Sequence, residues 1–395
     1  MAGASSVSEM AGPLEGIKAV ELGVWVAGPA AGGIMADWGA DVVKIEPPTG
    51  DPARLFGRMI GLDDGTNPPF EMDNRSKRSI VLDLTTDGGQ ATARQLISSA
   101  DVFITNVRPD ALHRLGLDYP SVAELNPRLV YGLITGYGET GPDANRPAYD
   151  VAAFWARSGV ADLLTKPGDT PPFQRGGMGD HLTGMTLAAA INAALVSRAR
   201  TGEGQLVSTS LYRQGAYTVS FDLNTFLLSG RPIAIGQRES MGNPCMNNYV
   251  AADGRRFWLV GLEADRHWPA LCRAVGRPEW LSDNRFTTAR DRARNSRELI
   301  AALDVIFASR TLAEWSETFA AEPELFWSPV NSMEDVLGDE QFLAAGGLVD
   351  VPDGDGSLPM VATPADFHGT PWAPRSAAPK LGEHTEEILA ELRAR

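Results

Sequence analysis

The chain has 395 residues, and its 50 acidic and 35 basic residues give a formal net charge of −15, so we expect two domains and no general nucleic-acid binding. No apolar run approaches the roughly 18 residues of a membrane span, and residues 1–12 lack the features of a signal peptide. Two cysteines are too few for a disulfide framework, which predicts a cytoplasmic protein. The lack of an apolar span predicts that the protein has no membrane partner.

Strand-like and helix-like segments alternate in the first half of the chain. A strand, a helix and a second strand within about 30 residues form a βαβ unit, which implies a parallel sheet. The predicted strands of this half are 16–22, 41–46, 79–82, 102–105 and 129–135, and the predicted helices between them are 29–38 and 86–98. This half is therefore expected to form an open α/β domain.

The pattern changes after residue 217. Residues 248–262 alternate as two strands around an Asp-Gly turn, which predicts a hairpin. Helical segments follow at 266–275, 296–308 and 312–321, and two strands and a charged helix are predicted at 348–351, 359–363 and 383–395. We therefore expect a large domain from 1–220, a smaller α+β domain from 221–329 and a return segment, 330–395, that completes the large domain.

The turn after the first predicted strand resembles a dinucleotide-binding turn only superficially. It contains glycines but lacks G-x-G-x-x-G spacing, and Val24, Trp25 and Val26 stand where the backbone would have to approach a pyrophosphate. No phosphate loop and no nucleophile elbow are present. The five histidines are scattered without ligand spacing. We expect neither a nicotinamide cofactor nor a metal.

Asp180 lies in a glycine-rich segment, 176–185, which leads into an apolar helix predicted at 182–199. Asp180 is expected at the first turn of this helix. Backbone N–H groups and the dipole of a helix favour an ionised acid at this place. A reachable carboxylate can attack an acyl group and carry it covalently. Aspartate is also among the commonest helix-capping residues. These residues alone leave both interpretations open, a cap and a nucleophile.

An acidic chain that binds an anionic cofactor must gather its cations locally. This chain has one basic cluster at Arg75, Lys77 and Arg78 and a second at Arg108 and Arg114. Such clusters are often only solvated surface, but they are also what phosphate recognition requires. Both interpretations remain for each cluster.

Short segments run in a fixed order through nearly the whole chain: 14–22, 28–29, 39–47, 74–80, 106–109, 126–130, 179–180, 201–205 and 381–385. Their order and spacing resemble the family III CoA-transferases, which include formyl-CoA transferase, carnitine CoA-transferase and α-methylacyl-CoA racemase. The resemblance implies an α/β fold in which a large Rossmann-like domain with a parallel sheet joins a smaller α+β domain. It also implies a homodimer of two interlocked chains.

The resemblance places the family's catalytic aspartate on Asp180. It implies that CoA moves from an acyl-CoA donor to a small carboxylic acid through an aspartyl anhydride and an aspartyl-CoA thioester. Gly177 and Gly179 are expected to allow close backbone approach at this site, and a helix N-terminus is expected to keep Asp180 ionised.

The resemblance also implies a set of contacts to coenzyme A, which enters as substrate. The residues that match the family's CoA-binding segments are Val26, Ala27, Asn74, Arg75, Lys77, Asn106, Arg108 and Arg114. Pro47 stands where formyl-CoA transferases have an arginine, and Arg54 and Lys44 are candidates to replace that phosphate contact.

Tyr149 and Asp150 separate the transferase branch from the racemase branch of the family. The racemases have a histidine base in a Gly-His-Asp segment, where this chain has Ala-Tyr-Asp. Tyrosine, with a pKa of about 10, is a poor base at neutral pH. His181 is the other candidate base, but neighbouring residues at the start of a helix point in different directions. A transferase is predicted, with a racemase or epimerase and a non-catalytic CoA-binding protein as alternatives.

Overall fold

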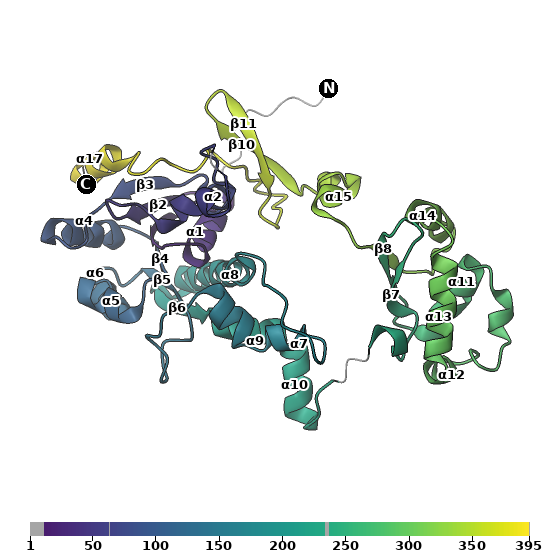
Figure 1. The fold of residues 1–395 in the computed structure, drawn as a ribbon. Coiled ribbons are helices and arrows are strands. Elements are labelled where there is room, and N and C mark those ends of the chain that lie inside the picture. Colours follow the sequence, from purple (N-terminus) through teal and green to yellow (C-terminus); the bar gives the residue numbers. More distant parts are fainter. Residues whose placement is uncertain (1–11, 63, 234–236, 395) are drawn as a thin grey trace. The chain divides into compact units, whose positions relative to one another are not determined.

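The computed structural model describes residues 12–62, 64–233 and 237–394. The chain forms two compact units (Figure 1), a large one that ends at Asn224 and resumes at Ala344, and a small one from Thr225 to Leu343. The colours of Figure 1 show that the large unit contains both the purple N-terminal and the yellow C-terminal segments. The boundaries predicted at 220 and 329 stay predictions.

The centre of the large unit is a parallel sheet, which in the described part of the chain has six strands in the order β3-β2-β1-β4-β5-β6. The strands are β1 (Lys18–Leu22), β2 (Asp41–Glu46), β3 (Arg78–Val81), β4 (Val102–Thr105), β5 (Val130–Thr135) and β6 (Gln205–Ser210). The predicted α/β fold with a parallel sheet is confirmed. Edge strand β6 was not predicted, because its sequence, QLVSTS, is mostly polar and mostly half-buried.

Helices cover both faces of the sheet. One face packs against α1 and α8, and the other against α4, α5, α6 and α17. The helices of this unit are α1 (Ala27–Asp37), α2 (Phe56–Met59), α3 (Pro68–Asn74), α4 (Asp87–Ser98), α5 (Pro109–Leu115), α6 (Tyr119–Leu125), α7 (Val160–Leu163), α8 (Met178–Thr201), α9 (Leu211–Thr218) and α17 (Thr385–Arg393), with the short segments η2 (Pro52–Leu55) and η3 (Val151–Ala156); α10 (Ser220–Ser229) leads out of the unit.

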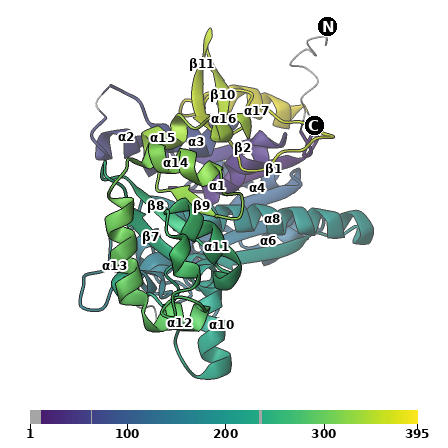
Figure 2. The same ribbon diagram turned by 90° about the vertical axis from the view of Figure 1, so that its right-hand side faces the viewer.

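Helix α8, seen side-on in Figure 2, begins four residues before its predicted start. Gly177 precedes it with a left-handed φ of 72°, a conformation that glycine adopts without strain. By length and composition α8 is apolar enough to cross a membrane. Leu187 and Ile191 are nevertheless fully buried in the core beneath the sheet, as expected for the core helix of a globular domain.

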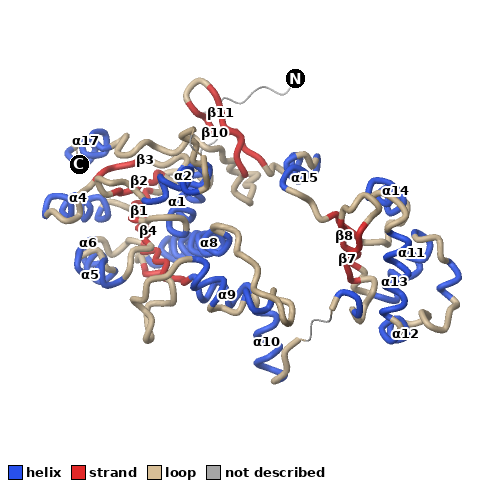
Figure 3. The backbone as a smooth tube through the Cα atoms, in the orientation of Figure 1, coloured by secondary structure: helices blue, strands red, loops and turns tan. Residues whose placement is uncertain are grey.

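The small unit has its own core and the predicted α+β composition (Figure 3). Its antiparallel sheet contains β7 (Met246–Val250), β8 (Arg256–Val260) and β9 (Trp327–Pro329). Its helices are α11 (Ala264–Ala274), α12 (Ala289–Arg294), α13 (Ser296–Phe307), α14 (Leu312–Ala320) and α15 (Met333–Leu337), with the short turns η4 (Arg238–Ser240) and η5 (Pro278–Leu281). The hairpin predicted at 248–262 corresponds to β7 and β8.

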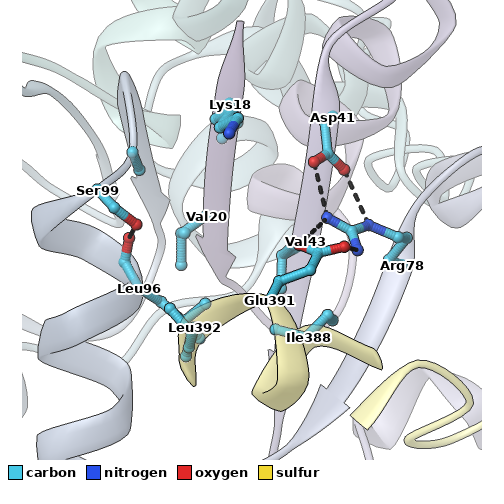
Figure 4. Close-up of a pocket in the computed structure, with 12 residues that line it drawn as sticks. Lys18, Val20, Asp41, Val43, Arg78, Leu96, Ser99, Ile388, Glu391 and Leu392 are labelled. Atoms are coloured by element: carbon cyan, nitrogen blue, oxygen red, sulfur yellow. Dashed lines mark hydrogen bonds and ion pairs between the residues drawn. The ribbon is translucent and has the colours of Figure 1, made fainter. Parts of the chain in front are cut away.

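The return segment joins the large unit after α16 (Glu340–Ala344). It forms the hairpin of β10 (Leu348–Asp353) and β11 (Gly356–Val361) and then α17. Arg78 on β3 holds this last helix through an ion pair to Glu391, and it also pairs with Asp41 on β2 (Figure 4). A further ion pair joins Arg78 to Glu387 on the same helix. The third cation of the first basic cluster therefore ties the end of the chain to the sheet.

Candidate active site

A pocket opens where the strand order changes direction between β1 and β4. Its space of about 620 Å³ is partly open to solvent, and it is lined by the turns after β1, β4 and β5 and by the first turn of α8. In open α/β sheets, ligands bind at such a switch point, outside the carboxyl ends of the strands. Of the predicted site residues, the pocket brings together Val26, Ala27, Asn106, Arg108, Tyr149, Asp150 and Asp180.

The turn after β1 is clamped from two sides. The side-chain amide of Asn106 hydrogen-bonds to both backbone groups of Val24. Its Oδ1 accepts from the N–H of Val24 at 2.9 Å, and its Nδ2 donates to the carbonyl of Val24 at 2.8 Å. Trp25 has a left-handed φ of 63°, which is strained for a bulky residue, and its N–H donates to Asp51 Oδ1 at 3.0 Å. Asn106 therefore positions the turn that presents Val26 and Ala27 to the pocket.

Asp180 is the third residue of α8, not its cap. The capping contact comes from Asp150, whose Oδ2 accepts from the N–H of Gly179 at 3.0 Å. A side chain at position 179 would overlap Asp150 Oδ1 and the ring of Phe154, so only glycine fits there. Among the described residues, no hydrogen bond engages the Asp180 carboxylate. The capping interpretation of Asp180 is wrong, and the carboxylate is free to meet a ligand.

The electrostatics of Asp180 differ from the expectation that the helix keeps it ionised. Burial, reinforced by the negative charges of Asp150 and Asp73, raises the pKa of Asp180 to about 7, although the imidazole of His181 acts in the opposite direction. Desolvation and like charges together outweigh the favourable helix terminus. Oδ1 of Asp150 is buried and has no partner within the described residues. Within the pocket, the negative charge of Asp150 therefore opposes ionisation of Asp180.

His181 follows Asp180 but belongs to a different surface. Its Nε2 lies 3.0 Å from Asp73 Oδ1 on α3, and its ring lines an apolar groove with Met178, Leu182 and Met185 rather than the pocket of Asp180. Tyr149 lies at the pocket and is exposed, with its ring edge-on to Trp25 at a centroid distance of 6.0 Å. Tyr149 therefore lines the pocket of Asp180, whereas His181 lines the apolar groove.

Two predicted phosphate ligands are well placed for an anion. Arg108 lines both the Asp180 pocket and an adjoining polar hollow, which Arg114 and Asn145 also line. Both arginines are exposed, and no ion pair within the described part of the chain engages them. Two arginines without an ion-pair partner among the described residues therefore lie on one side of the Asp180 pocket, although Asp110 also lines the hollow.

Three residues in and beside the other basic cluster, Asn74, Arg75 and Lys77, do not lie where the predicted CoA contacts require them. Lys77 is fully buried, and its Nζ lies 2.6 Å from Glu21, 2.9 Å from the carbonyl of Pro29 and 3.1 Å from Asn74 Oδ1. Arg75 forms a buried bidentate pair with Asp37. Asn74, Arg75 and Lys77 therefore stabilise the interior and do not face the pocket.

The candidates to replace a phosphate contact at Pro47 are also occupied. Lys44 is buried between Glu21 and Asp51, at 2.9 Å from each carboxylate, and Arg54 pairs with buried Glu46. Sequence reasoning missed the acids that engage these cations. The available signal was Glu21, an acid inside an otherwise apolar strand, which requires a buried partner.

Chemically, the site offers a free carboxylate, a second carboxylate behind it and cations on one side. In the residues that the structure describes, no cluster of His, Cys, Asp and Glu could hold a metal ion.

Known proteins match this chain over nearly its full length. The sequence profile of CoA-transferase family III matches residues 14–385. The chain is 33% identical over 383 residues to the (R)-2-hydroxy-4-methylpentanoate CoA-transferase of Clostridioides difficile, covering 96% of this chain and 95% of the relative. It is 37% identical to the succinate–glutarate CoA-transferase of Agrobacterium fabrum, covering 96% of both.

A crystal structure of a CaiB/BaiF family protein from Brucella suis superposes with a TM-score of 0.84 at 33% identity, covering 96% of this chain and 99% of that one. Sequence and fold agree, and the chain belongs to CoA-transferase family III, as an enzyme of the kind that its relatives are named for, a CoA-transferase.

Proposed function

We propose that Asp180 is the nucleophile that carries first the acyl group of a donor thioester and then CoA. The observation that supports this most directly is the placement of Asp180: a carboxylate without a hydrogen-bond partner among the described residues lines the pocket at the switch point of the sheet. Unlike a serine or cysteine, an ionised carboxylate has no proton to lose before it attacks.

Each step exchanges one acyl bond for another. An oxygen of Asp180 attacks the donor thioester, the C–S bond breaks, and CoA leaves as thiolate from a mixed anhydride. The thiolate then attacks the aspartyl carbonyl and releases the donor acid, which leaves an aspartyl-CoA thioester. The acceptor carboxylate attacks the aspartyl carbonyl of this thioester, the C–S bond breaks, and CoA leaves as thiolate from a second mixed anhydride. The thiolate then attacks the carbonyl of the acceptor acid and releases the Asp180 carboxylate. The products are the new acyl-CoA and free Asp180, so the cycle needs no ATP.

The surrounding residues hold the carboxylate and shape the pocket. Gly179 lets Asp150 approach the helix start, and Gly177 supplies the left-handed turn before it. A pKa of about 7 makes Asp180 more basic than an ordinary aspartate, and basicity strengthens a nucleophile as long as a sufficient fraction is ionised. Exclusion of water protects the anhydride from hydrolysis.

The CoA moiety is proposed to run from Asp180 towards Arg108 and Arg114. Val26 and Ala27 lie on the wall where the thioester would enter, and the two exposed arginines lead to the phosphates. The acids handled by the two relatives, judged from their names, range from a branched hydroxy acid to dicarboxylates. The proposed acceptor is accordingly a small carboxylic acid, and the proposed assembly is an interlocked homodimer in the cytoplasm.

The test is the nearly isosteric variant Asp180→Asn. We expect it to fold and bind CoA but to lose transfer by about three orders of magnitude or more, because the amide cannot form the anhydride. In the native enzyme, acyl-CoA followed by hydroxylamine should place a hydroxamate on the peptide that carries Asp180, detected by mass spectrometry. Asp162→Asn, at an exposed position on α7, is the matched control. Full activity in a verified, undeamidated Asp180→Asn preparation would remove the nucleophile role.

A further inference from the structure

Asp73 contacts the imidazole of His181, and two further aspartates, Asp180 and Asp150, lie near enough for their charges to act on it. Asp73 on α3 contacts it directly, with Oδ1 3.0 Å from Nε2 and only 4% of the Asp73 side chain exposed. Asp180 precedes it on α8, and Asp150 lies before η3. If all three acids were ionised, a protonated imidazole would be the cation that faces them.

Besides Asp73 and His181 itself, the charged side chains among the described residues that line the groove are Asp37 and Arg75, which pair with each other. Apolar side chains of α1, α3 and α8 form the groove beside the ring, and the charged pair at its edge, Asp37 with Arg75, is already neutralised. Gly177 leaves room for the imidazole, because a Cβ atom at this position would lie 3.2 Å from Nδ1 of His181. The glycine leaves the ring the space in which it meets Asp73.

We propose that His181, held by Asp73, is a positioning residue that keeps a positive charge beside Asp180 and thereby lets this carboxylate ionise next to Asp150. The inference rests on the proposed role of Asp180 as nucleophile. His181 itself touches no substrate in this scheme, since its ring faces the groove and not the pocket.

The directions in which the pKa values of His181 and Asp180 are shifted agree with this geometry. Burial disfavours the charged imidazole, but the hydrogen bond to Asp73 and the negative charges of Asp73, Asp180 and Asp150 outweigh it and raise the pKa of His181. In return, the charge of His181 works against the burial that raises the pKa of Asp180. Such a coupling is reciprocal in free energy, so removing either charge should shift the pKa of the other group.

The first experiment does not depend on catalysis. In the full-length enzyme with carbon-13-labelled histidine, the His181 resonance is assigned by elimination, as the one that remains when each of the other four histidines is replaced in turn, and it is titrated by NMR. In Asp180→Asn, the His181 pKa should fall by about one pH unit, because its anionic neighbour is gone. An unchanged His181 titration would overturn the inference, whether or not Asp180 proves to be the nucleophile.

The second experiment measures the pH profile of kcat/KM. The attacking form of Asp180 is the anion, so the acidic limb reports its ionisation. His181→Gln should move this limb to higher pH by about one pH unit and leave the alkaline plateau within a few-fold of native. His368→Gln, at an exposed position, should leave the profile unchanged. A lower plateau with an unmoved limb would show a merely structural role and overturn the inference, and the NMR titration decides if His181→Gln fails to fold.

Discussion

The large unit contains two groups of buried or half-buried charges that differ in how the charges add up. The balanced cluster lies beneath the turn after β1 and consists of Glu21, Asp51, Lys44 and Lys77. The acidic cluster lies at the start of α8 and consists of Asp73, Asp150, Asp180 and His181. Two acids meet two lysines in the first, whereas three acids meet one imidazole in the second.

This difference separates structural from chemical use of buried charge. In the balanced cluster, each ion has a partner, and the result is a fixed turn: Lys44 also donates to the carbonyl of Gly23 at 3.0 Å, and Asp51 accepts from Trp25. In the acidic cluster, negative charge is in excess, and burial together with this excess raises the pKa of Asp180. Unbalanced charge in a pocket is what marks a candidate reactive group.

The largest expected effect is on stability, from breaking the balanced cluster. Lys44→Met removes a cation that two buried carboxylates share, which should destabilise the fold by about 3–5 kcal/mol. Burial opposes the charge of Lys44, but Glu21 and Asp51 raise its pKa above the usual lysine value, so it is charged in the native state. Urea unfolding measures the change. Lys18→Met, on the same sheet but exposed, should cost less than about 0.5 kcal/mol; equal effects would contradict the comparison.

A smaller effect, of opposite sign, is expected from relieving the acidic cluster. The native pKa of Asp180, about 7, lies above its unfolded value near 4. Its contribution to stability is therefore most favourable below about pH 4 and worsens as pH rises to 7. Asp180→Asn escapes this loss and should be more stable than native by about 1–3 kcal/mol at pH 8, with no such gain near pH 4.

Chemical unfolding of Asp180→Asn and native enzyme at pH 4.5 and 8 measures this difference. The same substitution at Asp162 serves as the control, since an exposed aspartate should show no pH-dependent gain. A stability difference that is the same at both pH values would mean that Asp180 is not held in an unfavourable charge state.

The smallest expected effect concerns the cations that stay outside both clusters. Arg108→Ala and Arg114→Ala should each weaken CoA binding about 5-fold and flatten its salt dependence, because exposed charges contribute modestly and are screened. Calorimetry at two salt concentrations is the measurement. Arg200→Ala, exposed at the far end of α8, is the matched control. Unchanged affinity and salt response in both pocket variants would show that phosphates bind elsewhere.

Much of this protein is determined by local sequence. Short apolar runs predict β1 to β5, because a strand covered on both faces buries nearly every residue. Alternation with a period of two predicts the hairpin of the small unit, because only one face of it is buried. Gly177 and Gly179 likewise mark the start of α8, since a left-handed turn and a close approach each exclude a side chain. The candidate nucleophile was found from this local signal together with the resemblance.

The partners of the charges were decided only by the tertiary structure. Lys77 and Arg108 look alike in sequence, yet one is buried against Glu21, 56 positions away, and the other is exposed at the pocket. The charge state of Asp180 is also a tertiary property, because it depends on Asp150 and Asp73, which are remote in the chain. A residue type specifies which charge is present, whereas burial and neighbours, set by the fold, decide what that charge can do.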